Sequence, residues 1–145
     1  MMGAMIISAL TGFLLIVTDF AGGYWRDSYT EGWFWLSAWN TIWGFIILIP
    51  MALAMFYMAY WSSSAMRDPS IITISQLKRF FMFSLAIGGF TLFLGIVFAV
   101  VMIIEDYDDW WLDVGFYGGL IGGFLAALIF YQAKKQAEAM GLRPS

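Results

Sequence analysis

The sequence predicts an all-α membrane protein in which four transmembrane helices form two antiparallel hairpins and pack as a small bundle. Of the 145 residues, 62% are hydrophobic and only 12% are charged, which is too apolar for a soluble domain of this length. The chain also holds four apolar runs, and each is long enough for the roughly 20 residues that a spanning helix needs. We therefore expect one domain, 1–145, with spans over about 4–24, 33–61, 78–104 and 111–133.

The first two spans form the first predicted hairpin. The run 4–24 is apolar from its start but lacks the basic segment and the cleavage site of a signal peptide, so we expect a retained span. It ends in the polar stretch GGYWRDSYTEG, which suits a short loop. The run 33–61 is longer than a bilayer requires, and Pro50 removes one backbone hydrogen bond in its middle, so a tilt or kink is expected.

The last two spans form the second hairpin. Asp68 and Pro69 suit a helix start, because the carboxylate can cap and proline fits the first turn. The helix that follows is expected to begin in the head-group region before it enters the bilayer as span 78–104. The acidic turn EDYDDWWLD leads into span 111–133, and Gly141 and Pro144 end the exposed helical tail. Both outer turns run into tryptophan-rich segments, EGWFWL and DDWWLD, that we expect to open spans two and four.

Charged residues predict the orientation. Six of the seven basic residues fall in the second loop and the tail: Arg67, Lys78, Arg79, Lys134, Lys135 and Arg143. Eight of the ten acids fall on the opposite side: Asp19, Asp27, Glu31, Glu105, Asp106, Asp108, Asp109 and Asp113. The positive-inside rule then predicts a multi-pass protein of the cell membrane with both termini in the cytoplasm.

Composition also restricts the chemistry. The chain has no cysteine and no histidine, which excludes thiolate sites, histidine-dependent catalytic triads and the usual haem and zinc ligands. Neither a GxGD protease motif nor a glycine-rich phosphate loop with a suitably placed lysine is present. We expect no enzyme activity, no cofactor and no nucleic-acid partner.

The strongest local pattern is a stripe of small residues in the fourth span, with a shorter counterpart in the third. Its members are Gly115, Gly118, Gly119, Gly122, Gly123, Ala126 and Ala127, together with Gly88 and Gly95. Such faces let helix backbones approach closely, which is a main source of helix association in lipid. The stripe predicts a helix-packing interface, either with another helix of this chain or with another subunit.

An acidic outer rim is the second pattern, formed by Glu105, Asp106, Asp108, Asp109 and Asp113. Charge runs at membrane edges usually set topology in solvated loops, and attraction of a cation is the alternative. The ligand spacing of an EF-hand is missing, so no metal site is assigned.

Aromatic side chains and two polar residues complete the candidates. The tryptophans and tyrosines gather at the two membrane boundaries, where interfacial belts are expected, with an aromatic ligand site as the alternative. Asp19, near the outer end of the first span, and Asn40, in the second, are intramembrane polar residues that we expect to lie at similar depth. The structural interpretation is a hydrogen bond between the two side chains. The functional interpretation is that the carboxylate of Asp19 takes part in the activity of the protein.

These features predict a non-enzymatic membrane protein that acts through helix association. We expect an accessory or structural subunit that is embedded in the lipid bilayer and contacts other membrane subunits or further copies of itself. The alternative is a small oligomeric cation channel or transporter with an acidic extracellular mouth. Few polar residues line the spans, which favours the first hypothesis.

Overall fold

Four helices and three short strands make up the protein. The computed structural model describes residues 1–26, 31–39, 42–105 and 109–142, with the backbone alone for Trp25, Arg26 and Glu31. In chain order the elements are α1 (Met2–Val17), β1 (Ala21–Arg26), β2 (Glu31–Leu36), α2 (Ile42–Arg67), a 3₁₀ turn (Pro69–Ile71), α3 (Ile74–Ile104), β3 (Asp109–Leu112) and α4 (Val114–Ala139). The described chain is therefore mostly helical, as the sequence predicts.

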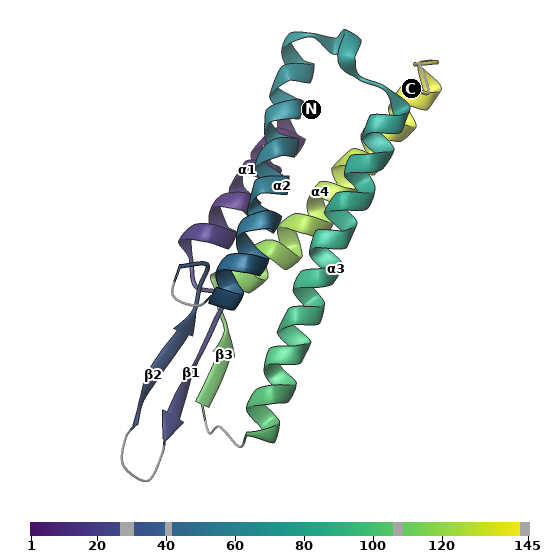
Figure 1. Cartoon of the computed structure of the whole chain (residues 1–145). Coiled ribbons are helices and arrows are strands. Elements are labelled where there is room, and N and C mark those ends of the chain that lie inside the picture. The colour runs from purple at the N-terminus through teal and green to yellow at the C-terminus, as the bar shows by residue number, and fades with distance from the viewer. Residues whose placement is uncertain (27–30, 40–41, 106–108, 143–145) are drawn as a thin grey trace.

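A small antiparallel sheet is the main departure from the predicted all-α fold. Its strand order is β2-β1-β3, so β1 pairs with strands from both halves of the chain (Figure 1). The strands take up residues that were expected to end the first span and to open the second and fourth. These residues are rich in tryptophan and phenylalanine, which favour strands, and Gly22 and Gly23 disfavour continuation of a helix.

The length of the helices supports membrane crossing for three of them. α2, α3 and α4 are long and apolar enough to span a bilayer, which identifies the chain as a membrane protein. α1 has 16 residues and a length of about 24 Å, less than the ~30 Å of a hydrocarbon core. The predicted count of four full spans is thus not established by helix length.

The helices pack in the order α2, α1, α4, α3. α1 contacts α2 and α4, and α4 contacts α1 and α3, whereas α2 and α3 touch each other little (Figure 1). Both termini lie toward one end of the bundle, and the sheet lies at the opposite end, which we call the sheet end. Contacts between α1 and α4 therefore join the two predicted hairpins.

Local capping explains where several helices begin and end. Asp68 accepts a hydrogen bond from the backbone N–H of Ser70 and starts the 3₁₀ turn, while Thr73 caps α3 through the N–H of Gln76. Gly141, with φ of 74°, ends the helical tail, and the next residue donates back to the carbonyl of Ala137. Gly141 ends the helical tail as predicted, whereas Asp68 caps a separate 3₁₀ turn and the predicted helix begins only at Ile74.

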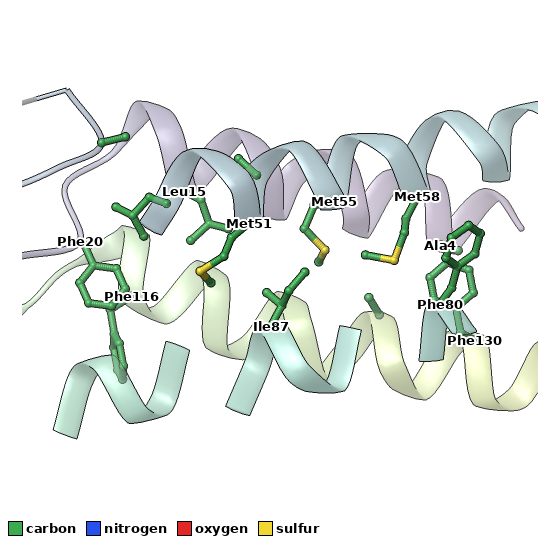
Figure 2. Packing of buried hydrophobic residues seen from close by; sticks show 14 of the residues in the cluster. Ala4, Leu15, Phe20, Met51, Met55, Met58, Phe80, Ile87, Phe116 and Phe130 are labelled. Atoms are coloured by element: carbon green, nitrogen blue, oxygen red, sulfur yellow. The ribbon is translucent and has the colours of Figure 1, made fainter. Parts of the chain in front are cut away.

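Large apolar side chains fill the centre of the bundle. Met51, Met55 and Met58 point from α2 into the space between the helices, at i, i+4 and i+7 (Figure 2). Phe80 and Phe130 pack against each other with ring centroids 5.5 Å apart, and both are fully buried. The flexible methionines fit between helices of different tilt, which makes packing their evident role.

Candidate functional site

The small-residue stripe of α4 lies against α3 on one side. A Cβ atom at Gly123 would stand 2.6 Å from the backbone nitrogen of Gly88, so these two helices meet backbone to backbone. The same construction at Gly95 places the new atom against the ring of Phe116. The α3–α4 crossing therefore depends most on glycine at position 123, where a side chain would meet backbone, whereas at Gly95 the ring of Phe116 would have to move.

The other side of the stripe lies against α1 and the segment that follows it. A Cβ atom at Gly118 would lie 2.8 Å from Leu14, and one at Gly122 would overlap the side chain of Thr11. At Gly115 the close neighbour is the backbone carbonyl of Asp19, which accepts a hydrogen bond from the Gly115 N–H at 2.9 Å. α4 thus has close crossings on two sides.

The remaining predicted stripe residues are covered as well. Gly119 faces both Leu15 of α1 and Thr91 of α3, and Ala126 and Ala127 are almost completely buried. Three helices of one chain therefore share the small-residue faces that the sequence singled out. A partner that binds this protein would have to meet a different surface.

The described residues of the predicted acidic rim do not form a cluster. Asp113 caps α4, because its Oδ1 accepts from the N–H of Val114 at 2.7 Å and its Oδ2 accepts from the indole of Trp111 at 3.2 Å. Glu105 and Asp109 are exposed at the ends of α3 and β3. Asp106 and Asp108 lie outside the described residues. Within the described chain, no three His, Cys, Asp or Glu side chains gather closely enough to hold a metal ion.

The predicted polar pair near the membrane boundary consists of Asp19 and Asn40. Asp19 lies in the connection between α1 and β1, not inside a helix as expected, because α1 already ends at Val17. Asn40 and the side chain of Arg26 lie outside the described residues. The backbone of Asp19 has a clear role through its bond to Gly115, whereas its side chain is partly exposed.

One face of the sheet carries an aromatic cluster that is turned away from the helices. Residues that pair directly across antiparallel strands share a face, which brings Trp33 beside Tyr24 and Trp35 and Trp111 beside Gly22. The ring centroids of Tyr24 and Trp33 are 4.7 Å apart, and those of Trp33 and Trp111 are 5.7 Å apart. We call these four residues, Tyr24, Trp33, Trp35 and Trp111, the outward aromatic face.

The opposite face of the sheet packs on α3. Phe34 and Trp110 both contact the ring of Phe98, at centroid distances of 6.4 and 6.2 Å. Gly23 lies under the ring of Phe34, where a Cβ atom would come within 2.8 Å. Glycine at this position is therefore needed for the ring of Phe34 to lie over β1 and reach α3.

An apolar pocket of about 530 Å³ lies between α2 and α3 at the sheet end. The two helices scarcely touch, and Phe20, Phe34 and Leu36 line the space between them at this end. The lining residues are Phe20, Phe34, Leu36, Trp43, Gly44, Ile47, Leu48, Leu94, Val97, Phe98, Val101 and Met102. None of these side chains is charged, so the pocket suits an apolar occupant.

The sequence prediction missed both the sheet and this pocket. Gly22 and Gly23 disfavour a helix at the end of the first predicted span, but the aromatic residues of the strands stand in consecutive runs and lack the alternation that is typical of strands. The pocket had no local signal, because its walls come from three segments far apart in the chain.

Comparison of the chain with models of known protein families, with curated proteins and with solved structures finds no significant match.

Proposed function

We propose that this chain is a non-enzymatic integral membrane protein that serves as an accessory or structural subunit of a membrane complex. Its partner binds at the outward aromatic face of the sheet. The chain lies in the cell membrane with both termini in the cytoplasm, which puts the sheet end outside. The proposal rests mainly on one observation, namely that a sheet built from both halves of the chain presents an aromatic face away from the bundle.

The closed packing of the bundle supports a partner at the sheet. The small-residue faces of α1, α3 and α4 are already used within the chain, so they offer no close crossing to another helix. The exposed fractions of Trp33 and Trp35 are 54% and 44%. Tryptophan and tyrosine are enriched among the residues that contribute most to binding at protein interfaces.

Charge indicates the chemistry of the partner. Asp109 is exposed and pairs directly across from Tyr24, at the edge of the outward aromatic face. Glu105 is exposed nearby at the end of α3. The five basic residues whose side chains are described, Arg67, Lys78, Arg79, Lys134 and Lys135, all lie toward the opposite end of the bundle. The partner is therefore a membrane protein with basic residues beside an apolar surface at the outer membrane boundary.

The alternative of an oligomeric cation channel gains little support. Phe80, Phe130 and Met55 are fully buried and fill part of the centre of the bundle with apolar side chains, which do not suit a water-filled path. Asp113, one member of the predicted acidic mouth, is occupied as a helix cap. A pore would have to form between copies of the chain.

Photocrosslinking in living cells tests the accessory-subunit proposal. Trp35 is replaced by the photoreactive residue benzoylphenylalanine, and the matched control carries the same residue at Phe93, an exposed position of α3. We expect a discrete adduct with a second protein from position 35, none from position 93, and loss of the adduct when Asp109→Lys is added. An adduct with the mass of two copies of this chain, or no adduct, would contradict the proposal.

A further inference from the structure

We propose that the pocket between α2 and α3 holds one hydrocarbon chain of a membrane lipid whose head group carries an ammonium group. This inference goes beyond the proposed function, because the pocket is a separate surface from the outward aromatic face. It follows from the depth, the chemistry, the size and the electrostatic surroundings of the pocket.

The depth of the pocket matches one leaflet of a bilayer. Its α3 wall runs from Leu94 to Met102, a length of about 12 Å along the helix axis. Its α2 wall occupies the first two turns of that helix, from Trp43 to Leu48. Half of a hydrocarbon core is about 15 Å thick, so a pocket between these two apolar helices opens to the acyl chains of one leaflet.

The walls of the pocket exclude polar occupants. Leu48, Phe98 and Met102 are each less than 10% exposed and form a floor without charged groups, while Val97 and Val101 stand at the rim. A polar ligand would lose its hydrogen bonds to water here without replacement. Apolar cavities also do not retain water, so an empty pocket would lose dispersion contacts along its whole lining. A hydrocarbon chain restores these contacts.

The size and place of the pocket suit a narrow occupant. The pocket measures about 530 Å³ and lies between α2 and α3, which scarcely touch each other. A flexible, unbranched hydrocarbon chain can follow such a space between two helices.

Charged residues beyond the α3 wall of the pocket indicate the head group. Glu105 caps α3 only three residues beyond Met102, and Asp109 opens β3 on the same end of the molecule. The described basic side chains lie toward the other end, so the potential near the mouth is negative among the described groups. Anionic lipids are repelled there, and a head group with an ammonium is attracted within a Debye length.

The test uses reconstituted full-length protein and two photoactivatable lipids that carry a diazirine in the acyl chain. One is a phosphatidylcholine and the other a phosphatidylglycerol, each present as a trace in phosphatidylcholine vesicles. After irradiation, mass spectrometry maps the adducts. We expect severalfold more adduct at Ile47, Leu94 and Phe98 than at Phe93, and we expect the phosphatidylcholine probe to exceed the phosphatidylglycerol probe at the pocket only.

Two valines of α3 provide a matched pair of variants. Val97 lines the pocket and is 41% exposed, whereas Val100 is 47% exposed and does not line it. Val97→Trp should fill the pocket and lower its adducts severalfold without change at Phe93, and Val100→Trp should change neither. Val97→Phe fills less of the pocket and should give an intermediate loss of pocket adducts. Thermal unfolding is measured for all variants.

Three results would overturn the inference. Pocket adducts no more abundant than those at Phe93 would exclude a resident chain. Adducts that survive both Val97 variants, or that fall equally with Val100→Trp, would show that the labelled space is not this pocket. Equal pocket labelling by the two probes would refute the assigned head group.

Discussion

At the scale of single residues, the two adjacent glycines of α3 differ sharply in what surrounds them. Gly88 meets the backbone of α4 at Gly123, whereas a Cβ atom at Gly89 would have nothing within 4 Å. The sequence prediction included Gly88 and Gly123 but could not identify which helix they touch. Hydropathy and residue spacing show that a helix face carries only small side chains. They do not show which helix packs against that face.

This contrast gives a stability prediction. Gly123→Ala places a methyl group 2.6 Å from the backbone of Gly88, so one helix must shift, and we expect a loss of about 1–3 kcal/mol in the free energy of unfolding. The matched control, Gly89→Ala, should change it by less than about 1 kcal/mol, as expected for an open helical position. Unfolding by sodium dodecyl sulfate, followed by circular dichroism, measures both. Equal effects of the two substitutions would contradict the backbone crossing.

At the scale of elements, helices were predictable and strands were not. Long apolar runs identify α2, α3 and α4 directly, because lipid requires each segment to satisfy its own backbone hydrogen bonds. The same runs continue into β1, β2 and β3, where backbone groups pair between neighbouring strands. Apolar composition alone does not distinguish a helix from a strand. The predicted spans 4–24, 33–61 and 111–133 therefore included residues that belong to the sheet.

The pairing between β1 and β3 leads to a crosslinking prediction. The chain has no native cysteine, and Tyr24 lies directly opposite Asp109. Tyr24→Cys with Asp109→Cys should form a disulfide on mild oxidation, because Cα atoms of directly opposed residues are ~4.5–5.5 Å apart. The reaction shows as faster migration on a non-reducing gel.

The control for this crosslink shifts one position along β3. Trp110 points to the opposite face of the sheet, so Tyr24→Cys with Trp110→Cys should react poorly. If the shifted pair reacts as fast as the direct pair, the strand register described for the sheet is wrong.

At the scale of the whole molecule, the charged side chains separate between the two ends of the bundle. The described basic side chains lie toward one end of the bundle, and Glu105, Asp109 and Asp113 lie toward the other, as the loop charges indicated. The pocket and the outward aromatic face were beyond the reach of the sequence, because each needs segments that only the fold brings together. Phe20 and Phe98, for example, are far apart in the chain and line the same pocket.

Orientation in the membrane can be tested with single cysteines. Met66→Cys lies at the end of α2 with the basic residues, and Glu105→Cys lies at the sheet end; both native side chains are exposed. A membrane-impermeant maleimide should label Glu105→Cys in intact cells and Met66→Cys only after permeabilisation, because the proposed topology places the basic end in the cytoplasm. The parent chain, which lacks cysteine, gives the background. The reverse pattern would invert the proposed topology.

The order of synthesis adds a consequence of the β2-β1-β3 arrangement. β1 is translated about 80 residues before β3, which corresponds to about 4–16 s at ~5–20 residues per second. Throughout that interval one edge of β1 has no partner strand, because β3 has not yet been translated. The first half of the nascent chain therefore enters the membrane with an incomplete sheet. The sheet is completed only when β3 and α4 have been synthesised.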